Sequence, residues 1–250
     1  MKFHALLAAS LLFACTLIAQ PSGESSRGPD GGTQYFVDGI KVLPASGKPF
    51  SGRSTTEWTR TLEDGTVMTT HLYAMVARDS QGRIFREVRG FVPLDSSEPS
   101  KLTEIRIFDP TTHTRTACKV ATHRCSVTSY HAPTSFTPGP VGDFDHGKRS
   151  LTRENLGSDS MDGLNVIGTR ETLTINAGVV GNSQPLVTTR EFWYSADLQV
   201  NLSITRQDPR EGTQTVHVQD VSRSEPDPAM FQVPAGYVIE NLPGPAPADK

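Results

Sequence analysis

Two cysteines are the residues whose type and spacing point most directly to chemistry. The chain has three cysteines, but Cys15 lies in an apolar N-terminal run, which leaves Cys118 and Cys125 on either side of the hexapeptide KVATHR. An even pair in an exported chain predicts a disulfide, and opposed positions of an antiparallel hairpin lie within disulfide range. A metal site that adds His113 and His123 is the alternative, but the spacing matches no zinc pattern and four ligands would crowd one hairpin. We therefore predict a disulfide and no metal site.

An acidic segment around His146 is the second candidate. Asp143, Asp145 and Glu154 fall at positions one, three and twelve of a calcium-binding loop. Lys148, however, occupies the sixth position, where such a loop needs glycine. We interpret the segment as a solvated loop.

Hydrolytic chemistry finds little support in the sequence. Serine and histidine are frequent, but no Gly-x-Ser-x-Gly turn occurs. His71 and His217 fall within predicted strands and are interpreted as polar-face residues. Trp58 and Trp193 are interpreted as core or sheet-face anchors rather than a sugar-binding platform. No residue is assigned a catalytic or cofactor-binding role, and we expect a protein without enzymatic activity.

The element with the clearest pattern lies within Pro185–Tyr237. Apolar residues alternate there with polar ones, which predicts a strand with one apolar face. The alternating apolar residues are Leu198, Val200, Leu202 and Ile204. A strand that ends at Phe192–Tyr194 precedes this one, and a strand over Thr213–Val221 follows it. The stretch therefore predicts a three-stranded antiparallel meander with a candidate apolar face.

Further hairpins are predicted on either side of a long polar loop over Ser129–Arg149. Runs rich in β-branched residues alternate with Asp-Gly and other turn signals, for about ten strands in all. Gly168 is predicted to form a bulge. Only Asp227–Phe231 resembles a helical turn. The pattern predicts a mainly β protein with an antiparallel sheet.

The segment from residue 78 to residue 89 is rich in arginine. Its arginines are expected to pair with Asp79, Glu87 and acids on neighbouring strands. Arg86 shares a face with Ile84 and Val88, so neither face of this strand is cleanly apolar. We expect the strand to twist or to lie at a sheet edge.

The N-terminus predicts an export address. Residues 1–19 have the length and composition of a signal peptide, followed by a flexible leader over 20–34, a β domain over 35–240 and a disordered tail over 241–250. A lipid anchor on Cys15 is the alternative. The formal net charge of −3 is mixed along the chain and predicts no nucleic-acid binding.

Two stretches resemble known families. Leu62–Gly65, Ala77–Glu87 and Ile107–Pro110 resemble a family of uncharacterised secreted proteins of soil bacteria. Glu191–Ser195 through Phe231–Tyr237 is similar to the closing half of the lipoprotein-carrier-like (LolA/LolB-like) superfamily. The second resemblance implies a twisted antiparallel sheet curled into an incomplete barrel with an apolar concave face. Carriers of that superfamily bind lipoprotein acyl chains, and related periplasmic domains sense the state of the cell envelope.

We therefore expect an exported, non-enzymatic binding module that shelters an apolar or lipid-like ligand. Its partner would be a lipid or lipoprotein, and the protein a monomer in the periplasm or outside the cell. The alternative is a periplasmic sensor or protein-interaction domain that docks a membrane-anchored partner through exposed strand edges.

Overall fold

The computed structural model describes residues 25–27, 33–35, 39–131 and 138–240. The predicted signal peptide and C-terminal tail lie outside the described residues. Within the predicted leader, β1 (Ser25–Arg27) pairs with β2 (Thr33–Tyr35) in an antiparallel two-stranded sheet.

In the described part of the chain, fourteen further strands form one sheet. The first half of the chain contributes β3 (Phe50–Thr61), β4 (Val67–Arg78), β5 (Ile84–Arg89), β6 (Val92–Pro93), β7 (Leu102–Asp109), β8 (Thr114–Lys119) and β9 (Arg124–Ser129). The second half contributes β10 (Gly142–Phe144), β11 (Arg149–Met161), β12 (Leu164–Ile175), β13 (Leu186–Ser195), β14 (Val200–Asp208), β15 (Gly212–Ser222) and β16 (Val238–Glu240). Antiparallel pairing of β15 with β3 joins the two halves, and of these described strands only β16 pairs in parallel, with β9.

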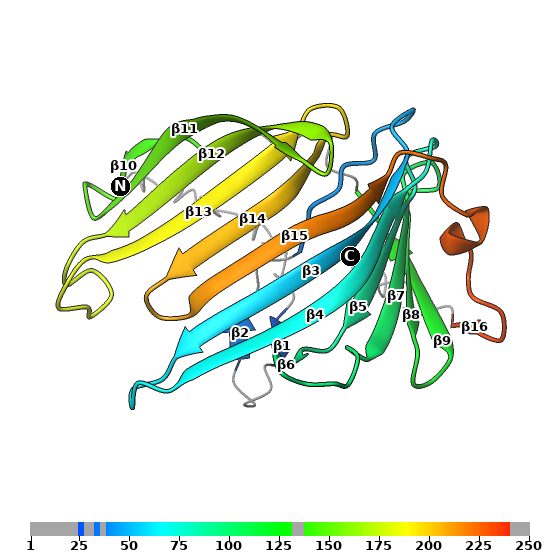
Figure 1. Ribbon diagram of the computed structural model, residues 1–250, viewed down its shortest axis with the longest axis horizontal. Helices are drawn as coiled ribbons and strands as arrows, with labels where there is room; N and C mark the ends of the chain where they lie inside the picture. The colour runs from blue at the N-terminus through cyan, green and yellow to red at the C-terminus, as the bar shows by residue number, and fades with distance from the viewer. Residues whose placement is uncertain (1–24, 28–32, 36–38, 132–137, 241–250) are drawn as a thin grey trace, which may run out of the picture.

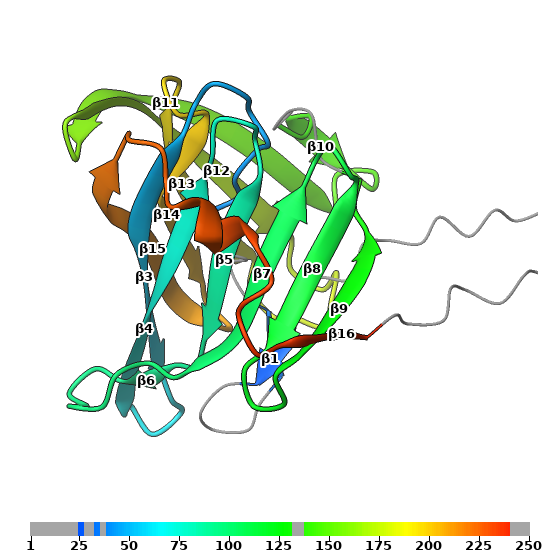
Figure 2. The same cartoon turned by 90° about the vertical axis from the view of Figure 1, so that its right-hand side faces the viewer.

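The sheet curls into an incomplete barrel (Figures 1 and 2). Its path runs from β10 at one edge to β9 and β16 at the other, and within the described ranges these edges do not pair with each other. A short 3-10 helix, η1 (Pro228–Phe231), lies against the outside of the barrel beside β5 and β7 (Figure 2). Its Phe231 packs on Ala77, Phe85 and Ile107, so these side chains point outward.

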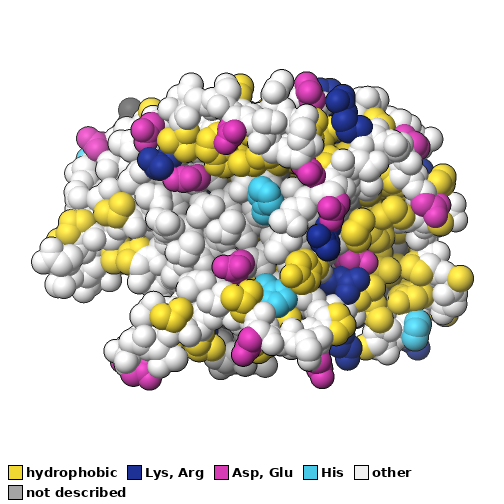
Figure 3. Space-filling view, viewed as in Figure 1, with side chains coloured by type: hydrophobic (Ala, Val, Ile, Leu, Met, Phe, Trp, Pro, Cys, Tyr) yellow, Lys and Arg dark blue, Asp and Glu magenta, His cyan; other side chains and the backbone are white. Residues whose placement is uncertain are grey.

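Side-chain alternation then assigns the inner face. Residues next in sequence point to opposite faces of a strand, and residues opposite in a ladder share a face. The outer face of the central strands is rich in threonine, whose β-branched side chain favours the extended backbone. One outer row across β11–β15, β3 and β4 consists of Thr152, Thr172, Thr189, Gln207, Thr213, Thr59 and Thr69. Figure 3 shows this polar outer surface as a broad white area.

The mainly β class and the meander β13–β14–β15 are confirmed. The number of strands is higher than predicted, partly because β10 lies within the expected long loop. The strand β5 is not at an edge, since it lies between β4 and β7. Its Arg86 is opposite Val76 of β4, points to the inner face and is half-buried there.

The predicted bulge at Gly168 was misplaced by one strand. The register shift lies on β11, between Asn155 and Gly157, opposite Gly168. Glycine at 168 has a different cause, since an added Cβ would lie 2.7 Å from the ring of Trp193 and 2.9 Å from Leu156 Cβ. Close packing of the indole, rather than backbone geometry, requires glycine here.

Candidate binding face

The inner face is apolar at one end of the sheet. The predicted apolar residues Leu198, Val200, Leu202 and Ile204 are all at most 6% exposed. They belong to one core cluster together with Ile40 and Val42 of the segment that precedes β3. Val42 also forms an isolated antiparallel bridge with Val200. This end of the face is therefore filled by the protein's own chain.

The strand carrying these residues is shorter than predicted. It begins at Val200, and Gln199 before it has a φ of 54° in the left-handed region. A register shift between Trp193 and Tyr194 also interrupts the pairing of β13 with β14. Leu198 is therefore buried from a turn rather than from the strand.

A buried arginine holds the N-terminal segment in place. The guanidinium of Arg78 donates hydrogen bonds to the carbonyl oxygens of Leu43 (2.7 Å), Lys48 (2.9 and 2.8 Å) and Leu198. Desolvation lowers the pKa of Arg78 to about 10, which still leaves it cationic at neutral pH. Because its donors are shared between two carbonyls of residues 39–48 and the carbonyl of Leu198, Arg78 ties this segment to the sheet.

The middle of the inner face is a mostly apolar row that is buried at its centre and half-buried at its two ends. Phe192 and Ile204 are opposite each other on β13 and β14, and the same row continues to Leu72 on β4. Phe192 and Leu72 retain partial exposure, whereas Ile204, Val216 and Thr56 between them in the row are at most 6% exposed. No helix of the described residues covers this region, because η1 lies on the outside. The half-buried side chains of Phe192 and Leu72 are therefore the apolar surface that a ligand could reach here.

The other end of the inner face is charged. One row across β11–β14 consists of Arg153, Glu171, Arg190 and Arg206. Arg153 forms an ion pair with Glu171 at 2.6 Å. The row continues to Gln214 on β15 and Trp58 on β3, both at most 3% exposed. The inner face thus changes from apolar to charged along the strands.

Asp208 is the centre of the ionic network at this end. It accepts hydrogen bonds from the side chains of Thr188 (3.0 Å), Arg206 (2.8 Å) and Arg210 (2.8 and 3.0 Å). Burial alone would raise its pKa, but the hydrogen bonds from Arg210 and Thr188 and the charge of Arg206 outweigh it and lower the pKa to about 2. Arg206 also pairs with Glu211. The carboxylates of Asp208 and Glu211 are therefore both paired with arginines of the same hairpin.

A shallow pocket of about 670 Å³ lies at the tip of the β14–β15 hairpin. Its lining includes Arg60, Thr189, Asp208 and Arg210. Arg60 stacks on Trp58, with its guanidinium carbon 4.4 Å from the ring centroid. Figure 3 shows the molecule hollowed at its left edge, where this hairpin ends short of its neighbours.

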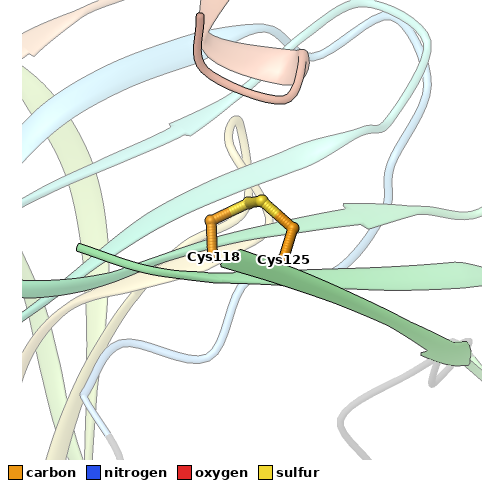
Figure 4. The surroundings of a disulfide bond; sticks show 2 residues. All are labelled: Cys118 and Cys125. Carbon is orange, nitrogen blue, oxygen red and sulfur yellow. A yellow bond between two sulfur atoms is a disulfide. The ribbon is translucent and has the colours of Figure 1, made fainter. Parts of the chain in front are cut away.

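The predicted disulfide is present and joins Cys118 of β8 to Cys125 of β9 (Figure 4). The two residues are directly opposite in the ladder and are buried. Since each sulfur is bonded to the other, neither can act as a metal-binding thiolate. Among the described residues, no group of three or more His, Cys, Asp or Glu side chains could hold a metal ion.

The calcium-loop residues are not brought together. Asp143 lies in β10, and Asp145 forms an ion pair with Arg149 at 2.5 Å. Glu154 pairs with Arg170 across the outer face. Their carboxylates have separate partners.

The two tryptophans act as anchors, as interpreted from the sequence. Trp58 is 3% exposed and donates its indole N–H to the carbonyl of Glu211 at 2.7 Å. Trp193 packs over Gly168. His71 is buried on the outer face, in edge-to-face contact with Tyr73.

Only part of the arginine-rich segment pairs as expected. Arg83 pairs with Asp79 at 2.6 Å, and Arg89 with Glu87 at 2.8 Å. Arg78 was expected to find an acid and instead bonds to backbone carbonyls. Its partners Leu43 and Leu198 are distant in sequence, so no local pattern could identify them.

The charged inner row was not identified from the sequence. The sequence did contain a signal: Arg190 lies two residues from Phe192, and Arg206 lies two residues from Ile204, so each arginine shares a face with an apolar residue. Strand alternation could have placed each one, but only the register of four strands shows that they are neighbours.

Comparisons with known proteins identify structures of similar arrangement. Neither a scan against protein-family models nor a search of curated proteins gave a match. An uncharacterised conserved protein from Thermus thermophilus is 11% identical, with 78% of this chain and 91% of that chain covered and a TM-score of 0.40. The MucA/MucB complex of Pseudomonas aeruginosa is 13% identical, with 74% and 56% covered and a TM-score of 0.35. The Mycobacterium tuberculosis lipoprotein LppX is 13% identical, with 71% and 88% covered and a TM-score of 0.25.

Similarity of this degree leaves the function to be argued from the chain's own residues. The fold and the face define a protein with an open, curled antiparallel sheet whose inner face is apolar at one end and charged at the other. The described residues contain no helix with the length and hydrophobicity of a membrane span.

Proposed function

We propose that the protein is an exported, non-enzymatic binding module that shelters an apolar or lipid-like ligand on its inner face. The half-buried apolar side chains of Phe192 and Leu72, left uncovered by any described helix, carry this proposal. The closed end formed by Leu198, Val200, Leu202 and Ile204 would bound the binding region and exclude water from it. The ligand would be a lipid or the acyl chain of a lipoprotein.

Two further features support the proposed role. The Cys118–Cys125 disulfide suits an oxidising compartment such as the periplasm or the cell exterior. The most perturbed carboxylate, Asp208, has its pKa lowered by arginine partners rather than raised, which makes it a poor general base at neutral pH. We infer a binding role and propose that the protein acts as a monomer.

Binding of the neutral apolar dye Nile red tests the proposal. Wild-type protein should give saturable fluorescence, and Leu72→Asp should weaken the affinity about tenfold because a carboxylate would be desolvated beside the ligand. The matched control is Tyr73→Asp, which places the same charge one residue along on the outer face, where Tyr73 is 43% exposed. Leu72→Met should bind like wild type.

Native mass spectrometry gives an independent check. Protein purified from an exporting host should carry a bound lipid. Wild-type protein that arrives empty and gives no saturable Nile red signal would overturn the proposed function.

A protein-interaction domain is the second candidate, favoured by one edge of the sheet. The short β10 covers only Arg149–Leu151 of β11, so among the described residues the rest of β11 is paired on one side alone. An edge of this kind can accept a strand from a partner. Thr152→Pro on this edge should abolish capture of a membrane-anchored partner while Nile red binding persists, if this second candidate is correct.

A further inference from the structure

The charged end of the inner face contains one arginine without a partner among the described residues. Arg190 of β13 lies opposite Glu171 on one side and Arg206 on the other. Glu171 is paired with Arg153 at 2.6 Å, and Arg206 is paired with Asp208 at 2.8 Å and with Glu211. Arg190 itself is exposed and forms no ion pair or hydrogen bond with the described residues.

Its position next to Arg206 is unfavourable in the free protein. Like charges directly opposite each other on a sheet repel, since their Cβ atoms are only about 4.5–5.5 Å apart. Arg206 is held in place by two carboxylates and cannot turn away. The sheet therefore presents an uncompensated positive charge that a bound anion would neutralise.

The wider inner face has the same sign. Across β11–β15 and β3, arginines at inner positions outnumber acids. The arginines are Arg60, Arg149, Arg153, Arg190 and Arg206; the acids are Glu171 and Asp208 on the strands and, from adjoining turns, Asp145, which pairs with Arg149, and Glu211, which pairs with Arg206. An anion would therefore be attracted to this end of the face, whereas the chain as a whole has a formal net charge of −3.

Apolar surface adjoins this charge directly. Phe192 lies two residues along β13 on the same face, and Ile204 is opposite Phe192 on β14. Leu173, opposite Thr188, lies on the other side of Arg190. A guanidinium at the boundary of an apolar surface suits a molecule with an oxyanion at one end and a hydrocarbon chain at the other, because its planar donors bind carboxylate or phosphate bidentately.

We propose that Arg190 binds the anionic group of an amphiphilic ligand, a carboxylate or a phosphate, whose hydrocarbon chain lies against Phe192. This inference rests on the proposed function and names the chemical class of its ligand. Selection for an anion would come from Arg190, while the apolar middle of the face would contribute affinity for any chain of suitable length.

Calorimetric titration with matched twelve-carbon ligands tests the inference. The ligands are dodecanoate, dodecyl phosphate and the neutral dodecyl maltoside, each below its micelle concentration, with inorganic phosphate as a head group alone. Wild-type protein should bind the two anionic ligands about tenfold more tightly than the maltoside. The ratio of dodecanoate to dodecyl phosphate affinity identifies the preferred oxyanion.

Arg190→Gln should remove this preference while binding of dodecyl maltoside is unchanged, and Arg190→Lys should keep part of it. The control is Arg223→Gln, which removes an exposed arginine that also lacks a partner among the described residues. The urea midpoint of Arg190→Gln should not fall, since the repulsion from Arg206 is relieved; a purely structural arginine would lower it.

Equal affinity of wild-type protein for all three ligands, or an unchanged preference in Arg190→Gln, would overturn the assignment of Arg190 and leave the proposed function standing. If no twelve-carbon ligand binds wild-type protein, both are wrong.

Discussion

Replacing Arg78 by alanine is the sharpest test of how the inner face is closed at one end. The side chain is fully buried and donates to the carbonyls of Leu43, Lys48 and Leu198. A hydrogen bond from a charged group contributes about 1.5–3 kcal/mol, and each carbonyl would lose its donor. These losses do not add in full, so we expect a decrease of about 3–5 kcal/mol in the free energy of unfolding.

That decrease is a large share of the roughly 5–15 kcal/mol that stabilises a typical domain. Urea unfolding followed by tryptophan fluorescence measures it, with Arg53→Ala as the control. Arg53 pairs with Asp220 at 3.0 Å, but the two side chains are 47% and 69% exposed, so its loss should cost less than about 1 kcal/mol. Arg78→Lys should fall between wild type and Arg78→Ala, because an ammonium lacks the planar fork that reaches separate carbonyls.

Limited proteolysis gives a local readout of the same change. Lys41 is exposed and lies in the segment that Arg78 holds, so trypsin should cut after Lys41 faster in Arg78→Ala than in wild type. A loss of stability under about 1 kcal/mol together with unchanged cleavage at Lys41 would refute the anchoring role of Arg78.

Three further changes test other parts of the structure. Asp208→Asn should cost about 2 kcal/mol at neutral pH, because the folded-state pKa of about 2 lies below the ordinary value of 3.8. This contribution is complete above about pH 4 and is lost as pH falls through 2, so the urea midpoints of variant and wild type should converge in acid. The double variant Cys118→Ala/Cys125→Ala should lose roughly 2–3 kcal/mol in urea unfolding, the value expected for a disulfide that closes a short loop, and the stability of the variant should not change with reductant. Gly168→Ala should cost about 1–3 kcal/mol in thermal unfolding, since the new methyl group would lie 2.7 Å from the indole ring, whereas Gly90→Ala, with no atom within 4 Å of its added Cβ, should be nearly neutral. Equal urea midpoints of Asp208→Asn and wild type at neutral pH would contradict the role of the Asp208 network. A double cysteine variant whose stability still changes with reductant would contradict the disulfide, and an unchanged melting temperature of Gly168→Ala would contradict the close packing of Trp193.

Local sequence patterns predicted the strands correctly where the alternation and the turn residues belong to the same hairpin. The meander over β13–β15 follows from alternation at Val200–Ile204 and from turn residues on both sides. The Cys118–Cys125 pairing could be predicted because both cysteines belong to one hairpin, so no distant contact was needed. For β5, whose mixed faces suggested a twisted strand or an edge strand, the edge alternative is wrong, because alternation within one strand cannot show which strands lie on either side of it.

The candidate site was only partly accessible to this reasoning. Leu198, Val200, Leu202 and Ile204 were found as an apolar set, but their cover, Ile40 and Val42, comes from a segment far earlier in the chain. Period-two alternation predicts that one face of a strand is apolar, but it does not show whether that face is covered by the protein's own chain or by a ligand.

The amino-acid order alone therefore determined the strand-forming segments, the hairpin turns and the disulfide, because period-two alternation, turn residues and short cysteine spacing are local properties. The tertiary structure decided which side of each strand faces inward, that Arg78 closes one end of that face, and that Arg190 and Arg206 lie side by side at the other. These features arise from the pairing of β15 with β3 and from the register across β11–β14, which join residues far apart in the chain. Only the curled sheet brings apolar surface and uncompensated positive charge onto one face.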